Sequence, residues 1–306
     1  MNRIILVAVA IFSSVFAIAG KSDITIKGTI TNQLADEVTF SYYTYEGNWL
    51  NFKQHEVSEA LDDKGNFLVL LPLSENYTLI HIQNGNEGTE IYGSPGDKII
   101  MTVNASDFDN TLKYDGVGMK ADVANFMARH MLKSGFTQNI HRAAQKMMAI
   151  EPDRFTDSLK LLIQNEMDFL VDNSAGLPQS FIKFWNALYE YNKYDFMLTY
   201  PYMHEIVKAK SYDIGAIPKE NYSVVKQVPE KFNDNYLYIS SYRSYISSYF
   251  SQQLSAEGAD NNEKMLELAH QKMPTASEEY VFADYISDHV KHHTLEQSEN
   301  DFTVFT

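Results

Sequence analysis

Apolar and polar residues alternate through the first third of the chain. Residues 24–30 follow a period of two, and further short runs rich in β-branched and aromatic side chains occupy 38–42, 67–71, 77–82, 89–92 and 98–103. Turn residues separate these runs, and Ser94-Pro95-Gly96-Asp97 suits a type II turn in which Gly96 takes the positive φ. Short strands at this spacing are typical of β-sandwiches, so we predict an antiparallel β-sandwich over residues 21–116.

The period of the pattern changes near Gly116. From Val123 onwards apolar residues recur at helical spacing, and such patterns continue almost to the end. Prolines stand at or near the boundaries of the segments, where a missing amide donor matters least. We predict helices over 119–133, 137–149, 153–172, 178–192, 195–208, 234–254, 260–272 and 276–293. The expected fold class is therefore α+β, with an all-α domain over residues 117–306.

The first twenty residues have the pattern of a secretory signal peptide. A short basic region with Arg3 precedes an apolar run, and Ala17-Ile18-Ala19 forms a small-x-small cleavage site. The run is too short to span a bilayer. We expect a periplasmic or otherwise exported protein that begins near Gly20 or Lys21 and is soluble after cleavage.

Composition narrows the possible chemistry. The chain has no cysteine, so it has no thiol for redox catalysis and none for a lipid anchor at the cleavage site. Its formal charge is −15, and its basic residues form no dense cluster, which argues against nucleic acid as a partner. No phosphate loop, dinucleotide fingerprint or nucleophile elbow occurs, so we predict no cofactor and no catalytic residue.

Two local patterns suggest binding. His289 and His293 stand four apart on a predicted helix, a spacing that can hold zinc or copper if a third ligand joins them, although solvated residues near a helix end are the favoured interpretation. Tyr238, Tyr242 and two further tyrosines, Tyr245 and Tyr249, follow a four-three-four spacing. This stripe is either a groove for a peptide or sugar or, the favoured interpretation, part of a core helix whose hydroxyl groups reach solvent or backbone acceptors.

Several motifs occur in an order known from one family. The signal peptide is followed by residues 26–32, by Lys64-Gly65-Asn66-Phe67, by residues 92–99 (Tyr-Gly-Ser-Pro-Gly-Asp-Lys-Ile) and by residues 108–118. This series resembles the N-terminal part of the exported TlpA-like thiol-disulfide oxidoreductases of Bacteroidetes-type bacteria. In that family the β domain and the helical region precede a thioredoxin fold that carries a Cys-x-x-Cys pair. This sequence contains no counterpart of the family's catalytic residues.

The resemblance implies a region without catalysis of its own that positions or recognises a partner, either an exported protein or a thioredoxin-fold domain. Two explanations stay open, a fragment whose thioredoxin domain lies beyond Thr306 and a stand-alone accessory region. We expect the working surface at the junction of the two domains, with Tyr92, Asp97, Tyr238 and Tyr242 as candidates. The alternative is a periplasmic protein that binds a glycan or small molecule in an aromatic groove.

Overall fold

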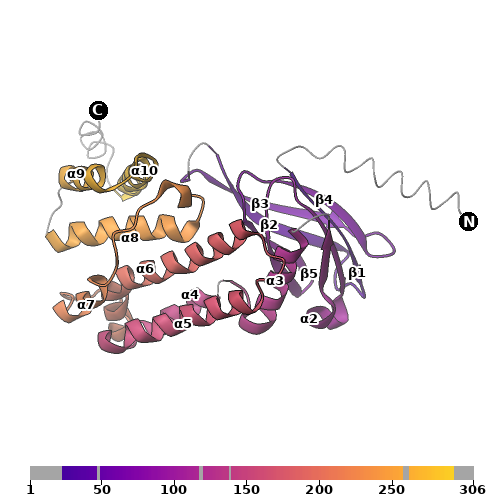
Figure 1. The fold of residues 1–306 in the computed structure, drawn as a ribbon, viewed down its shortest axis with the longest axis horizontal. Coiled ribbons are helices and arrows are strands. Elements are labelled where there is room, and N and C mark those ends of the chain that lie inside the picture. Colours follow the sequence, from indigo (N-terminus) through magenta and orange to yellow (C-terminus); the bar gives the residue numbers. More distant parts are fainter. Residues whose placement is uncertain (1–22, 47–48, 117–119, 138, 258–261, 293–306) are drawn as a thin grey trace, which may run out of the picture. The chain divides into compact units, whose positions relative to one another are not determined.

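The computed structural model describes residues 23–46, 49–116, 120–137, 139–257 and 262–292, with strands first and helices after them (Figure 1). Contacts divide the chain into two compact units. Unit 1 comprises the described residues within 1–47, 51–139 and 173–182, and unit 2 those within 48–50, 140–172 and 183–306. The α+β fold class is confirmed. The predicted signal peptide lies outside the described residues.

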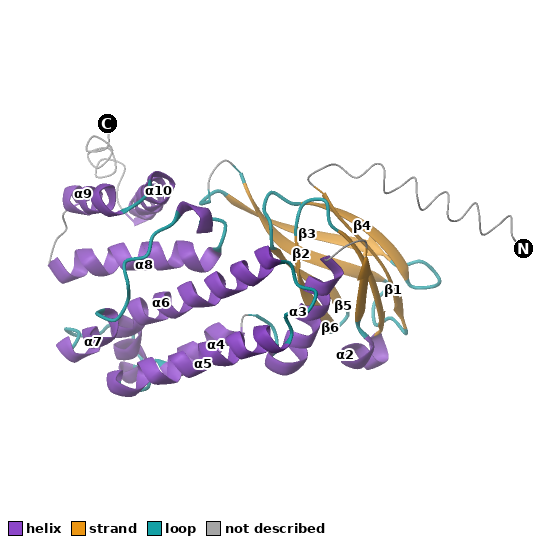
Figure 2. Cartoon of the chain, viewed as in Figure 1, coloured by secondary structure: helices purple, strands orange, loops and turns teal. Residues whose placement is uncertain are grey.

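Unit 1 contains two four-stranded sheets, which Figure 2 draws in orange. Sheet A has the order β4-β1-β7-β8, and sheet B has the order β3-β2-β5-β6. The strands of sheet A are β1 (Asp23–Thr31), β4 (Asn66–Pro72), β7 (Lys98–Asn104) and β8 (Lys113–Gly116). Those of sheet B are β2 (Glu37–Tyr45), β3 (Phe52–Ala60), β5 (Thr78–Asn84) and β6 (Glu87–Gly93).

Sheet A is mixed, and the prediction of a purely antiparallel sandwich was wrong at one pair. β1 pairs antiparallel with β4 but parallel with β7, whereas the other strand pairs are antiparallel. Neighbouring parallel strands require a long crossover. Here the chain between β1 and β7 contains all the strands of sheet B. The alternation of apolar residues within β7 does not indicate its direction relative to β1.

The core of unit 1 is formed by the alternating apolar positions of both sheets. Ile24, Ile26 and Ile30 of β1 are fully buried, as are Phe40 of β2 and Ile80 of β5. The turn before β7 has the predicted conformation, because Gly96 has a φ of 84° and the Asp97 N–H donates to the Ser94 carbonyl. α3 (Lys120–Ser134) packs against β6 and β8 and contributes small side chains to this core.

Two strands were not predicted from the pattern. β3 is polar on both faces, and most of its side chains are exposed, so it lacks the apolar alternation of a half-buried strand. β8 has only four residues and follows a short helix, α2 (Phe108–Thr111), after the 3₁₀ turn η1 (Ala105–Asp107). Both strands are held by pairing with a neighbouring strand rather than by an apolar stripe of their own.

Unit 2 is helical. Its main helices are α4 (Asn139–Met147), α5 (Pro152–Asp172), α6 (Gln179–Ala209), α8 (Ser240–Glu257), α9 (Asn262–Lys272) and α10 (Thr275–His292), although the first residue of α4 and the first turn of α6 belong to unit 1. Shorter elements are η2 (Lys219–Asn221), α7 (Tyr222–Val225) and η3 (Asp234–Tyr236). α8 contacts α9 and α10 (Figure 1). Its Tyr242 and Tyr245 rings pack against Tyr191 of α6. None of the helices in the described part of the chain combines the length and apolarity that a membrane crossing needs.

α6 corrects the prediction of two helices over 178–192 and 195–208. It is one helix of 31 residues with Pro201 inside it. A proline in a helix interior removes one backbone hydrogen bond and costs about 3 kcal/mol. Burial on both sides of this position offsets that loss, because Trp185, Tyr200 and His204 are fully buried along the same helix.

Candidate functional site

The predicted tyrosine stripe lies mostly in the core of unit 2. Tyr242 and Tyr245 are fully buried, Tyr249 is 3% exposed, and Tyr238 is half-buried. Tyr191 of α6 packs against Tyr242 and Tyr245, with ring centroids 4.8 and 5.3 Å apart. A sugar cannot stack on rings enclosed in this way, so the aromatic groove predicted as an alternative is not formed by these residues.

The hydroxyl groups of the stripe bind internal partners. Tyr242 Oη accepts from the Asn233 N–H (2.8 Å), and Tyr245 Oη donates to the Pro229 carbonyl (2.6 Å) while it accepts from the Lys231 N–H (3.0 Å). Burial raises the pKa of Tyr245. These hydrogen bonds hold the loop before α8 against the helix. The stripe is therefore part of a core helix whose hydroxyl groups reach backbone groups, which is the interpretation that the sequence favoured.

The two candidates from the first domain are also buried. Tyr92 is 7% exposed, and its ring centroid lies 6.2 Å from that of Phe181 within unit 1. Asp97 is 5% exposed and closes its turn, because Asp97 Oδ2 accepts from the Ser94 N–H (3.0 Å). Tyr92 and Asp97 belong to unit 1, whereas Tyr238 and Tyr242 belong to unit 2.

The histidine pair falls at the end of the described chain. His289 lies within α10, but its side chain is not described, and His293 lies outside the described residues. Among the side chains that the structure does describe, no group of three or more His, Asp or Glu residues is placed to bind a metal ion. The weak metal candidates therefore stay a prediction.

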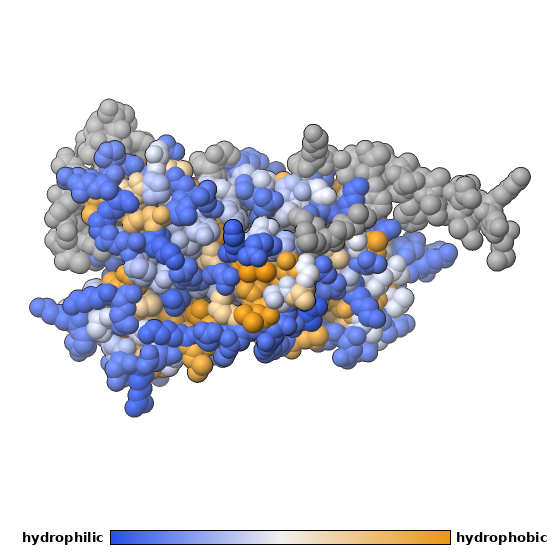
Figure 3. All heavy atoms as spheres, viewed as in Figure 1, coloured by the Kyte–Doolittle hydropathy of each residue, from blue (hydrophilic) through white to orange (hydrophobic). Residues whose placement is uncertain are grey.

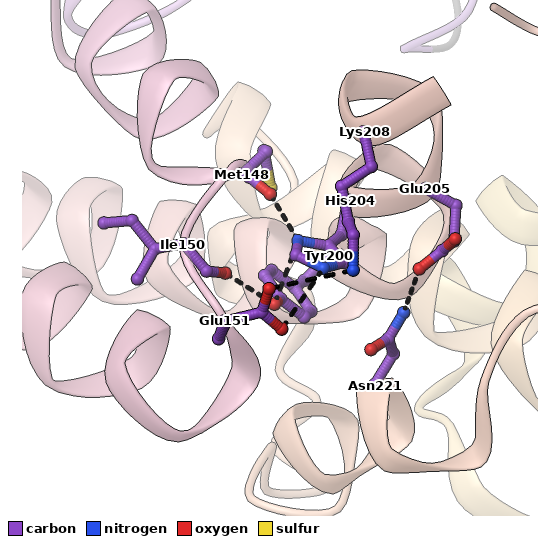
Figure 4. Close-up of polar contacts among 8 residues, drawn as sticks. All are labelled: Met148, Ile150, Glu151, Tyr200, His204, Glu205, Lys208 and Asn221. Carbon is purple, nitrogen blue, oxygen red and sulfur yellow. Dashed lines mark hydrogen bonds and ion pairs between the residues drawn. The ribbon is translucent and has the colours of Figure 1, made fainter. Parts of the chain in front are cut away.

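A histidine that the pattern did not single out is the centre of a polar cluster in unit 2 (Figure 4). His204 of α6 is fully buried, and its Nδ1 lies 2.6 Å from the Met148 carbonyl. Because a carbonyl only accepts, Nδ1 carries a proton. One turn earlier on α6, the Tyr200 hydroxyl donates to the Ile150 carbonyl (2.7 Å).

This cluster lies just after the end of α4. Met148 is the first residue after the helix and Ile150 stands two positions further on, so His204 and Tyr200 bind carbonyl groups of the connection to α5. His204 Nε2 lies 3.9 Å from Glu151 Oε2 and makes no hydrogen bond within the described chain, while Lys208 Nζ lies 3.7 Å from Glu151 Oε1. The Glu151 side chain is 64% exposed, so the cluster extends from a buried imidazole to solvent. Its evident effect is to fasten the α4–α5 connection to α6.

A second polar cluster surrounds a buried carboxylate in unit 1. Glu90 of β6 is fully buried. Its Oε2 accepts from both the N–H (2.8 Å) and the hydroxyl (2.6 Å) of Thr137, and His81 Nδ1 lies 3.0 Å from its Oε1. The Glu90 N–H in turn donates to the sulfur of Met131 (3.1 Å). These contacts join β6 to the end of α3 and to the segment that follows it.

Hydrogen bonding keeps this carboxylate charged. Burial raises the pKa of Glu90, but the nearby His81 imidazole and the two hydrogen bonds from Thr137 more than offset that effect, so its pKa lies below the usual value. The His81 side chain is 34% exposed, so the contact with Glu90 extends from the buried carboxylate to the surface of sheet B.

Strand register places further polar residues beside His81. Ser41 of β2 is directly opposite His81, and Glu56 of β3 is directly opposite Ser41. Directly opposed residues share a face of the sheet with Cβ atoms about 5 Å apart. Glu56, Ser41, His81 and Glu90 therefore form a row across the outer face of sheet B, which we call the polar row. The exposed end of the row lies on β3.

No family model, curated protein or solved structure matches this chain. One signal in the sequence could have pointed to the polar row, because Glu90 directly precedes the apolar residues Ile91 and Tyr92 within one strand-forming run. A charge in such a strand needs a partner. The partner, Thr137, lies 47 positions away in the sequence.

Proposed function

We propose that this chain acts by binding a partner protein, as the recognition region of an exported protein of the TlpA-like kind, and that β3 is the docking edge. The resemblance of the sequence motifs to the TlpA-like family supports the first part of this proposal, the kind of protein to which the chain belongs. The open edge of sheet B supports the mode of binding, because a partner in extended conformation can add to a sheet through main-chain hydrogen bonds.

The observation that carries the proposal is the exposure of β3. It has nine residues and pairs with β2 alone among the described strands. Only Thr39–Ser41 of β2 also pair with β5, so the ribbon beyond them is two-stranded. On this ribbon Phe52 is 61% exposed and Tyr43 is 45% exposed, with ring centroids 5.8 Å apart. Exposed aromatic side chains beside an open edge are typical anchors for a partner.

Charges on the strand restrict which partners can add. Lys53, Glu56 and Glu59 interrupt β3, and such charges discourage edge-to-edge aggregation of a free strand. The face in Figure 3 is mostly hydrophilic, with apolar side chains gathered in smaller patches. A partner that adds to β3 must therefore suit the charges as well as the two aromatic rings.

Photocross-linking tests the docking edge. A photoreactive amino acid at Gln54, which is exposed on β3, is expected to form an adduct with a partner in envelope extract, whereas one at Leu161, which is 64% exposed on α5, is not. Phe52→Ala should reduce the Gln54 adduct several-fold because it removes an anchor. Tyr212→Ala removes an aromatic ring that is 81% exposed in unit 2 and should leave the yield unchanged. Equal adducts from both positions would refute β3 as the docking edge.

A further inference from the structure

Lys193 of α6 belongs to a small group of charged side chains in unit 2 and is half-buried. Its Nζ lies 4.7 Å from the centroid of the Tyr194 ring, and within the described chain it forms no hydrogen bond and no ion pair. Glu190, one turn earlier on the helix, is already engaged, because its Oε1 accepts from Lys231 Nζ (2.8 Å) and from the Tyr194 hydroxyl (2.9 Å). The Lys193 amine therefore has no carboxylate of its own.

A lysine of α5 stands at about the same level as Lys193. The two helices run antiparallel: Phe155 in the first turn of α5 packs on Tyr200 in the last third of α6, with ring centroids 4.2 Å apart. Five positions further along α5 and seven positions back along α6, the helices reach Lys160 and Lys193. Lys160 has its own carboxylate, because its Nζ lies 3.7 Å from Asp157 Oδ1.

The surroundings of Lys193 favour its uncharged form. Burial lowers the pKa of the Lys193 amine, and the like charges of Lys160 and Lys231 lower it further, while Glu190 opposes them only in part. A larger fraction of this amine than of a fully solvated lysine is therefore uncharged near neutral pH. An uncharged amine has the lone pair that a nucleophile needs.

We propose that Lys193 is a site of covalent acylation, at which the ε-amine attacks the carbonyl carbon of an acyl phosphate. A carbon–nitrogen bond forms and the bond from that carbon to the phosphate oxygen breaks, which yields an amide and inorganic phosphate, while the amine proton passes to water. Lys160 and Lys231 attract the anionic phosphate group and stabilise it as it leaves. The amide carries no charge, so acylation also removes the repulsion among the three lysines.

Two acetylating reagents, acetyl phosphate and acetic anhydride, test the proposal on the whole chain, with the modified lysines measured by peptide mass spectrometry. The reference amine is Lys183, which is exposed on the same helix. Near neutral pH, acetic anhydride should modify Lys193 about threefold faster than Lys183, although Lys193 is less accessible, because more of its amine is uncharged. With acetyl phosphate the ratio should be larger, because only this reagent carries an anion for the neighbouring lysines to attract.

A pair of substitutions separates the lysine cluster from a general change in charge. Lys160→Gln removes a neighbouring charge without altering the reacting amine, so it should slow acetylation of Lys193 about twofold near neutral pH and have no effect on the anhydride reaction in strong alkali. Lys183→Gln removes the same charge from α6 itself and should leave the rate at Lys193 unchanged. Equal rates at the two lysines, the same ratio with both reagents, or equal effects of the two substitutions would overturn the proposal.

Discussion

Thr137→Val should loosen the attachment of the segment after α3 to β6. The substitution keeps the shape of the side chain and the backbone N–H but removes the hydroxyl that donates to Glu90 Oε2 over 2.6 Å. Glu90 is fully buried, so no water replaces the lost donor. A hydrogen bond to a charged group contributes about 1.5 to 3 kcal/mol, and we expect a loss of unfolding free energy in that range.

The loss should depend on pH with a definite sign. The pKa of Glu90 in the folded protein lies below its usual value, so the carboxylate contributes stability above the usual glutamate pKa. That contribution disappears as pH falls through the lower pKa of the folded state. The difference between the parent protein and Thr137→Val should therefore be largest near neutral pH and should shrink in acid.

Urea unfolding followed by circular dichroism measures the free energy, and amide exchange of β6 locates the effect within unit 1. The control is Thr102→Val, which alters an exposed threonine of β7 and should change stability by less than about 0.5 kcal/mol. Equal effects of the two substitutions at neutral pH, or a difference that grows in acid, would refute the role assigned to the Thr137 hydroxyl.

Three further substitutions have defined outcomes. Gly65→Ala should cost about 1 to 3 kcal/mol in urea unfolding, because Gly65 has a φ of 74° and an added Cβ would lie 2.0 Å from a backbone oxygen of the neighbouring strand; an unchanged midpoint would contradict this. Burial raises the pKa of Asp195 above its unfolded value, so ionisation destabilises the fold as pH rises. Asp195→Asn should be more stable than the parent at neutral pH, by an amount that declines towards acid, and a thermal unfolding series across pH checks the sign. Tyr245→Phe should cost about 1 to 3 kcal/mol, since two backbone groups lose their partner, whereas Tyr202→Phe, an exposed control on α6, should have little effect on the same thermal transition.

Alternation predicted the strands that have one buried face. β1 and β7 follow the predicted ranges closely, and Gly96 takes the positive φ that its turn requires. β3 escaped the same reasoning because both of its faces carry polar side chains, which removes the apolar period, although its open edge is what the proposed function uses. The alternation of apolar and polar residues is therefore least informative for an open edge strand.

The break predicted at 193–194 in the helical region is absent. Tyr191 and Tyr194, on either side of it, are buried along one continuous helix that also accommodates Pro201. The tyrosine stripe of α8 has the same periodicity whether it lines a groove or a core, and only its packing against Tyr191 decides between them. A local pattern carries no information about packing between elements that are far apart in the sequence.

The polar clusters could not be predicted for a related reason. Glu90 meets Thr137, and His204 meets the carbonyl of Met148, 56 positions away, so each contact depends on the folded chain. The sequence supplies the residue types and shows a charge directly before the apolar residues Ile91 and Tyr92. It does not supply the partner that makes the charge tolerable.

Unit 1 is not continuous in the chain, because residues 173–182 return to it after a segment of unit 2. Phe181 in that returning segment lies 5.4 Å from Phe126 and 5.5 Å from Tyr77, measured between ring centroids. During synthesis the sandwich emerges from the ribosome first, but its aromatic surface stays uncovered until residue 181 has followed. A fragment that ends at Asn139 would keep those rings open to water and to other chains. During synthesis there is thus an interval in which the β-sandwich has been made but its aromatic surface is still exposed to water.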